Sequence, residues 1–356
     1  MGITIGGSVT LSGNITLSAP GASHWVIGEA SGTGDIGYAL GGIRTSWTFY
    51  DRMSGNSSTI DGAYGKDASG NGIYLFSQSN SSGEVVRSST DITDGNLWTA
   101  INLPDGGQQF CDAVTWSNDS TNSTSGVWMV GRKNGHVYRS TDGAQTFTEI
   151  TLPNDTGYFI LSIAGNGAGK FVTGQRTRLH VSTDDGASFT SSTPFTADVI
   201  NGVAYTNNTW IVTYSKSGED NLFARTASDS DLSTWSSEVD LGILAPHGQS
   251  GQVNEPNNRA CLAAANGRVV IVSNERTGIA RLDINGTTTS NLANPTSLST
   301  GIRDIATDGH IWMIVTDDGD IHESTDNGAT FTKTVDDVRG TERNLQTVVA
   351  AQYLPL

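Results

Sequence analysis

Short segments in which apolar and polar residues alternate recur along most of this chain. They include residues 85–87, 136–138, 179–181, 222–224 and 320–322. Alternation with a period of two predicts β-strands that bury one face. No long stretch shows the 3.6-residue apolar period of an amphipathic helix. The pattern therefore predicts an all-β fold made of many short strands.

A turn motif follows five of these strands. Residues 140–147, 182–189 and 324–331 contain Ser-Thr-Asp, then Gly, then a final Phe, and residues 89–98 and 226–235 are longer copies that end in Trp. An Asp side chain in such a turn accepts hydrogen bonds from turn amides, and Gly tolerates a positive φ. The terminal aromatic ring packs between sheets. We interpret the motif as a folding device rather than as a catalytic or metal-binding group.

The spacing of the turns predicts the architecture. They begin at residues 89, 140, 182, 226 and 324, and the last interval is about twice the others. One repeat has therefore lost its turn, and residues 281–286 are its remnant. A period of roughly 42 to 51 residues is typical of a four-stranded propeller blade.

Counting the repeats predicts a single β-propeller over residues 23–356. Six full units run over residues 58–104, 108–153, 157–195, 198–242, 256–298 and 300–338. Residues 24–51 hold three strand-like pieces, and residues 345–351 resemble an inner strand. We expect 24–51 to join 343–356 in a seventh blade that leaves no open edge. A count of six or eight blades is the alternative if residues 24–51 are misassigned.

Residues 1–22 lie outside the repeats and form a predicted N-terminal β-arm. Residues 8–13 are echoed by residues 14–19, with strict alternation and a glycine between them. An isolated pair of strands is barely stable in water. The arm must therefore pair either with the chain's own blade or with another protein, and the sequence leaves both alternatives open.

Composition narrows the class of partner. The chain has 43 glycines, 8 prolines and a net charge of −16, while aromatic residues spread along it argue against disorder. A nucleic-acid-binding groove is not expected, because affinity for phosphate rests on Lys and Arg. The sequence shows no secretory signal and no apolar run that could span a membrane. Two cysteines are too few for a disulfide framework, so we expect a protein made in a reducing cytosol.

The Ser-x-Asp turns resemble Asp-boxes, the turns of bacterial-neuraminidase-like (BNR) repeats, and the architecture is similar to that of the sialidase superfamily. Sialidases bind their substrate carboxylate with three arginines, one of them in an Arg-Ile-Pro motif, and use a Tyr-Glu nucleophile pair. No Arg-Ile-Pro occurs here, and the arginines lack a recognisable context. The resemblance therefore implies the architecture without the catalytic residues.

No catalytic, cofactor-binding or metal-binding residue is predicted. Cys111 and Cys261 fall on inner strands of blades that face each other across the channel, too far apart for a disulfide. The six histidines show no metal-ligand spacing. Residues 317–320 lack the final Glu of a calcium loop, so we expect a hairpin turn there. Residues 243–257 form the longest insertion between blades and are a candidate contact surface.

Three features together favour a structural virion protein of a tailed bacteriophage, marine phages in particular. They are the alternating leader within residues 1–22, the acidic composition and the missing export signal. Its position in the particle is left open: it could belong to the tail, to a knob or to a fibre, or it could decorate the capsid. The protein would assemble in the host cytoplasm, dock through its arm to other virion proteins as a homo-oligomer, and contact the host surface without entering a membrane. The alternative is a carbohydrate-binding or glycan-processing sialidase-like propeller. We expect no enzymatic activity and no cofactor.

Overall fold

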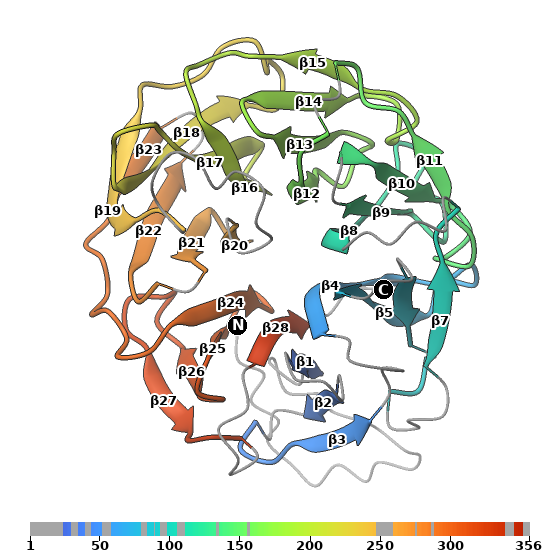
Figure 1. Cartoon of the computed structure of the whole chain (residues 1–356), viewed down its shortest axis with the longest axis horizontal. Coiled ribbons are helices and arrows are strands. Elements are labelled where there is room, and N and C mark those ends of the chain that lie inside the picture. Colours follow the sequence, from blue (N-terminus) through green and yellow to red (C-terminus); the bar gives the residue numbers. More distant parts are fainter. Residues whose placement is uncertain are drawn as a thin grey trace, which may run out of the picture.

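The structure is a computed structural model. It describes residues 24–29, 35–39, 44–51, 58–79, 84–88, 90–92, 98–104, 111–132, 135–154, 157–246, 259–274, 276–285, 288–338 and 345–351. The described strands form seven antiparallel sheets of four strands each, arranged around a central axis (Figure 1). The predicted all-β propeller with four-stranded blades is confirmed. The N-terminal arm predicted over residues 1–22 lies outside the described residues.

Every sheet contains an inner strand that lines the centre and a second strand paired with it. The inner strands are β4 (Ser58–Lys66), β8 (Cys111–Ser117), β12 (Ile160–Gly165), β16 (Val199–Thr206), β20 (Ala260–Ala265), β24 (Ile302–Thr307) and β28 (Leu345–Ala350). Their partners are β5 (Gly72–Ser79), β9 (Val127–Arg132), β13 (Phe171–Gln175), β17 (Thr209–Ser215), β21 (Arg268–Ser273), β25 (Trp312–Thr316) and β1 (Trp25–Glu29).

Two further strands complete each sheet toward the rim. The third strands are β6 (Glu84–Arg87), β10 (Val137–Ser140), β14 (Arg178–Ser182), β18 (Asn221–Ser228), β22 (Ile279–Asn285), β26 (Ile321–Ser324) and β2 (Asp35–Ala39). The outer strands are β7 (Thr99–Asn102), β11 (Thr148–Ile150), β15 (Thr190–Ser192), β19 (Val239–Leu244), β23 (Thr288–Asn291), β27 (Thr332–Val335) and β3 (Thr48–Asp51). Among the described residues there is no helix that could cross a membrane.

The ring closes through strands from the two ends of the chain. β28 pairs with β1, with Trp25 opposite Ala350 and Ile27 opposite Val348. β28 also packs against β24 on one side and β4 on the other, so each inner strand contacts two inner neighbours. Arg44, between β2 and β3, adds an ion pair with Glu323 on β26, with 2.8 Å between Nε and Oε1.

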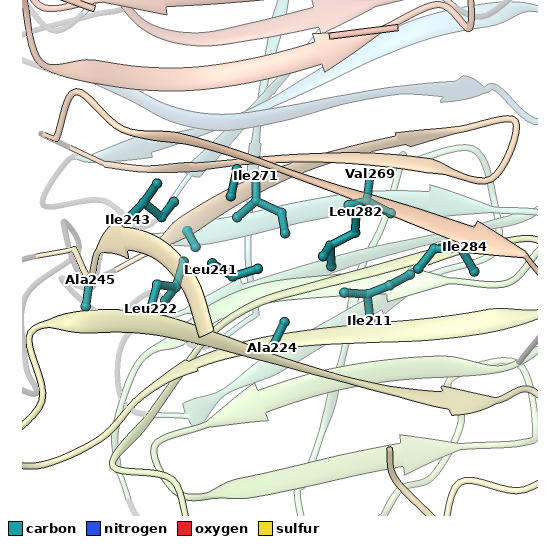
Figure 2. Packing of buried hydrophobic residues seen from close by; sticks show 12 residues of the cluster. Ile211, Leu222, Ala224, Leu241, Ile243, Ala245, Val269, Ile271, Leu282 and Ile284 are labelled. Carbon is teal, nitrogen blue, oxygen red and sulfur yellow. The ribbon is translucent and has the colours of Figure 1, made fainter. Parts of the chain in front are cut away.

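Apolar side chains fill the spaces between neighbouring sheets. Figure 2 shows one such layer, in which Ile211, Leu222 and Leu241 face Ile271 and Leu282 of the next sheet. Burying each of these side chains contributes about 1.5–3 kcal/mol. The largest fully buried rings lie at or beside the start of second strands and are Trp25, Trp128, Trp210 and Trp312.

The three turns that begin at Ser140, Ser182 and Ser324, between third and outer strands, share one hydrogen-bond pattern. In the turn at Asp326, the carboxylate accepts hydrogen bonds from Ser324 Oγ at 2.7 Å and from the Ala329 and Thr330 amides at 2.9 Å each. The Gly328 amide donates to Ser324 Oγ at 2.9 Å. Asp142 and Asp184 repeat the arrangement. The carboxylate therefore holds the turn, as the motif predicts.

These turns also lock neighbouring sheets together. Arg87 Nε donates to the Gly143 carbonyl at 2.9 Å, and Arg139 Nε donates to the Asp185 carbonyl at 2.6 Å. In both cases the arginine lies at the end of a third strand or one residue before it, and it reaches the turn of the next sheet. The motif thus joins neighbouring sheets as well as forming a local turn.

We expect Asp326→Ala to lower the free energy of unfolding by about 1–2 kcal/mol, because several turn donors lose their acceptor. These hydrogen bonds hold the pKa of Asp326 at about 2, below its ordinary value of 3.8. The stabilisation that the ionised Asp326 carboxylate contributes is present above pH 3.8 and is lost as the pH falls toward 2. Urea unfolding at pH 7 and at pH 3 measures it. The control is Asp336→Asn on the surface, and equal losses in both variants would contradict the role of the turn.

Candidate functional site: the central channel

A channel of about 560 Å³ runs along the axis between the inner strands. Small residues dominate its wall, including Ala63, Ala164, Ala264 and Ala306. Small side chains are needed where seven strands converge. The channel is the concave site around which polar side chains from several sheets gather.

Irregular pairing at the start of the inner strands sets the direction of these polar side chains. The register between β4 and β5 shifts between Thr59 and Gly62, and that between β24 and β25 shifts between Ile302 and Asp304. β8, β12 and β16 carry similar shifts. A β-bulge adds a residue on one strand and re-aims its side chain. Asp61 and Asp304 lie at or beside these bulges.

The re-aimed side chains bind backbone amides of the next inner strand. Asp61 Oδ2 accepts from the Val114 amide at 2.8 Å, and Asp304 Oδ2 accepts from the Val348 amide at 3.0 Å. Ser162 Oγ accepts from the Val203 amide, also at 3.0 Å. Buried amides without a partner are costly, and a strand edge presents a row of them. These side chains therefore supply hydrogen-bond acceptors to amides on the edges of the inner strands.

Arg259 crosses one end of the channel. It precedes β20, yet its Nη1 lies 3.4 Å from Asp61 Oδ1 on β4 and its Nη2 donates to the Gln346 carbonyl on β28 at 3.3 Å. Arg259 is 3% exposed. Asp304 belongs to the same cluster, because Thr347 Oγ1 donates to its carboxylate at 2.7 Å. The guanidinium therefore pairs with Asp61, while Asp304 lies close enough to act on Asp61 through its charge.

The pKa of Asp61 is raised although an arginine lies beside its carboxyl group. Burial raises the pKa of Asp61 to about 6, with Arg259 opposing the rise and Asp304 adding to it. Burial also raises the pKa of the nearby Cys261 thiol. Cys261 is a free, buried cysteine whose Sγ donates to the Arg303 carbonyl at 3.4 Å. A thiol held in its neutral form is a poor nucleophile.

The raised pKa of Asp61 predicts a pH dependence of stability. The folded state holds the proton more tightly than the unfolded state, so Asp61 contributes stability that is complete below pH 3.8 and lost as the pH rises through about 6. The difference in free energy of unfolding between Asp61→Asn and wild type is therefore expected to change between pH 4 and pH 7. Guanidinium unfolding of both proteins measures this difference. A difference that stays constant across the window would contradict it.

A hydrogen-bonded Tyr-Glu pair occurs on the sheet that contains β17, away from the channel wall. Tyr214 Oη lies 2.6 Å from Glu238 Oε2, and Arg225 Nε donates to the same Oη at 2.9 Å. Tyr214 is fully buried, and burial together with Glu238 raises its pKa to about 12. A nucleophilic tyrosine needs access to substrate and a lowered pKa. This pair instead packs with Phe195 and Phe223.

Other residues singled out in the sequence fall at separate places. Residues 317–320 form the hairpin turn between β25 and β26, with Gly319 N donating to Thr316 O. Within the described ranges, no group of three or more His, Cys, Asp or Glu residues is arranged to hold a metal ion. The side chain of Cys111 lies outside what the structure describes. Of the candidate contact segment 243–257, residues 243–246 are described, and Leu244 is 50% exposed.

Sequence reasoning did not single out Asp61 and Asp304 and noted Arg259 only as one of several scattered arginines. Asp61 and Asp304 precede small-residue segments of inner strands, and that position was the available signal. Nothing in the spacing indicated that Arg259 reaches across the ring, because β20 and β4 belong to sheets that are not neighbours.

Comparisons with known proteins agree on the fold. No family model matches the chain, and no curated protein matches it. YCF48 from Cyanidioschyzon merolae is 15% identical with a TM-score of 0.51, covering 78% of this chain and 84% of that one. A chain of the mitotic checkpoint complex is 13% identical with a TM-score of 0.55, covering 78% and 77%. The computationally designed Ika8 protein is 13% identical with a TM-score of 0.53, covering 90% and 86%. These similarities show a β-propeller fold.

Proposed function

We propose that this chain is a non-enzymatic structural protein of a tailed-phage particle, and that the propeller makes contacts with other proteins or with the host surface. A binding role is supported by the contacts of the channel carboxylates, which are already engaged by other groups of the fold. Asp61 and Asp304 each accept an amide of the neighbouring inner strand, and Asp61 also pairs with Arg259. Groups used in this way hold the ring together and do not form an acid/base pair.

The particle role is supported by the sequence. The alternating leader over residues 1–22 resembles the N-termini of small phage structural proteins, and the acidic composition fits as well. In this proposal the Ser-x-Asp turns are Asp-boxes of the BNR type, kept as fasteners of the fold. The arm docks the propeller to the particle, and the propeller faces outward.

Deleting residues 1–22 tests the docking role. The shortened chain is expected to keep its strand signal in circular dichroism and its thermal midpoint, but to be absent from gradient-purified particles. The matched control is the full chain with its leader order scrambled within residues 8–19, which is also expected to be excluded. Normal incorporation of the shortened chain would overturn the docking role.

A second candidate, carbohydrate binding, is favoured by aromatic side chains that line the channel. Tyr64, Trp116 and Tyr205 are half-buried there, and Trp116 Nε1 is fixed by a hydrogen bond to the Ser125 carbonyl at 2.8 Å. Aromatic faces beside polar groups suit small ligands such as sugars. A glycan array with wild type and Tyr205→Ala tests this. Binding that the variant loses would support it, and an empty array would exclude it.

A further inference from the structure

One level of the channel carries aromatic side chains on one side and small residues on the other. In all sheets but one, the inner-strand residue at this level pairs with an aromatic residue of the second strand, as Trp116 pairs with Trp128 and Ala350 with Trp25. The seven channel-lining residues of the level, which we call the aromatic slot, are Tyr64, Trp116, Gly165, Tyr205, Ala264, Thr307 and Ala350.

The aromatic slot is asymmetric around the axis. Its three rings come from β4, β8 and β16, with Gly165 of β12 between the last two, while β20, β24 and β28 supply the small residues. Neighbouring inner strands contact each other in this order around the ring (Figure 1). An arc of aromatic side chains therefore lies across the channel from an arc of small ones, which leaves room beside the rings.

The rings are held in place without a ligand. Trp116 Nε1 donates to the Ser125 carbonyl at 2.8 Å. Tyr64 and Tyr205 each pack against an aromatic ring of the paired second strand, with 5.0 and 4.9 Å between the ring centroids. All three rings are nevertheless half-buried and line the channel. A ligand that packs on them therefore orders few side chains, and this reduces the entropic cost of binding.

The open edges of the inner strands add backbone polar groups at the same level. The Val114 and Val203 amides point away from their second strands, because they donate to side chains of the preceding inner strand. Alternate residues of a strand direct their N–H and C=O groups to the same side. Trp116 and Tyr205 lie two residues further along β8 and β16, so their backbone groups face the channel as well. The aromatic slot thus offers hydrogen-bond donors and acceptors beside its rings.

Arg259 determines from which end a ligand enters. It contacts Asp61 and the Gln346 carbonyl, which lie near the starts of β4 and β28, whereas the aromatic slot lies toward the ends of the inner strands. The arginine is almost fully buried across that far end. A chain molecule that enters at the aromatic slot therefore stops before Arg259 and does not thread through the channel.

We propose that the aromatic slot binds the terminal pyranose of a glycan. The C–H face of a pyranose packs on aromatic faces, and its hydroxyl groups both donate and accept, so they match the backbone groups of the strand edges. The channel volume of about 560 Å³ lies in the range of small-ligand sites. The site rests on the carbohydrate-binding candidate proposed above and is independent of the particle role.

Isothermal titration of the full chain with the methyl glycosides of glucose, galactose, mannose, fucose and N-acetylglucosamine tests the proposal. We expect at least one of them to bind, and Tyr205→Ala to lower its affinity about tenfold through loss of the packed ring. Tyr205→Phe keeps the ring and should bind within about twofold of wild type. Absence of binding to every probe, or equal affinity in wild type and Tyr205→Ala, would overturn the proposal.

Two further variants separate the site from general effects on folding. Ala264→Leu adds bulk on the small-residue side and should weaken binding about tenfold while the thermal midpoint stays near that of wild type. Tyr158→Ala removes a half-buried ring that packs on Arg176 outside the channel lining, and it should bind like wild type. Full affinity in Ala264→Leu, or an equal loss in Tyr158→Ala, would contradict the aromatic slot as the site.

The glycan array distinguishes failure of this site from failure of carbohydrate binding as a whole. Glycans attached through their reducing ends should be retained when they share a non-reducing terminal sugar, and the methyl glycoside of that sugar should compete. An empty array would exclude both. Glycans that are retained equally by Tyr205→Ala, or that share only an internal sugar, would overturn the aromatic slot and leave carbohydrate binding standing.

Discussion

Replacing Arg259 with methionine is expected to lower the free energy of unfolding by about 3–5 kcal/mol at pH 7. The substitution removes the guanidinium that pairs with Asp61 in a buried cluster, and removing one partner of a buried ion pair is strongly destabilising. It also removes the donor to the Gln346 carbonyl on β28. Chemical unfolding monitored by tryptophan fluorescence gives the value.

The loss in Arg259→Met should shrink at pH 5, because Asp61, with a pKa of about 6, is then largely neutral in the wild type as well. The double variant with Asp61→Asn should recover part of the loss at pH 7. Arg268→Met is the matched control, since its pair with Asp283 is more exposed and pairs of that kind contribute about 0–1 kcal/mol. Equal losses for the two arginines would show that the channel cluster is not the reason.

Replacing Gly143 with alanine is the second substitution expected to have a large effect, about 3 kcal/mol. Gly143 has a φ of +71°, and a Cβ built there lies 2.2 Å from the Ala68 amide nitrogen on the neighbouring sheet's turn. An alanine adds left-handed strain of about 1–2 kcal/mol. The backbone contact adds about 1–3 kcal/mol more, because neither chain can move aside alone.

Gly218 provides the matched control for Gly143. Its φ is +83°, and a Cβ there meets nothing within 4 Å. Gly218→Ala should therefore lose only the strain, about 1–2 kcal/mol. Urea unfolding of the two variants separates the strain from the clash. If both lose the same amount, the close approach between the turns at residues 67–70 and 140–147 does not hold the sheets.

Much of the fold could be predicted because it follows from local chemistry. The alternation of strand residues and the Asp-Gly turns are short-range signals, and both repeat at blade length. The turn at Ser140 shows the limit of this approach. Its glycine comes one place early in the sequence, yet Gly143 and Ala144 take the two positive-φ positions held by Asp185 and Gly186 in the next turn. The glycine is displaced because the neighbouring turn approaches Gly143, a tertiary contact with no local signature.

The channel cluster was beyond prediction for a similar reason. Asp61, Arg259 and Asp304 are far apart in the sequence, and each lies in or beside an ordinary inner strand. The sequence shows which residues belong to inner strands but not which of them meet across the axis. The interblade arginines Arg87 and Arg139 escaped notice as well, although each directly precedes the serine that opens a turn motif or lies next to it. Their position could have marked them as a repeated feature.

The most direct test is the exchange of the amide hydrogens of Val114, Val203 and Val348, because we propose that the channel side chains fasten the ring. These amides donate to Asp61, Ser162 and Asp304, so nuclear magnetic resonance should find all three strongly protected. In Asp304→Ala, Val348 should lose protection while Val203 keeps it. Fast exchange of these amides in the wild-type protein would contradict this proposal, because the carboxylates would then be free for another role.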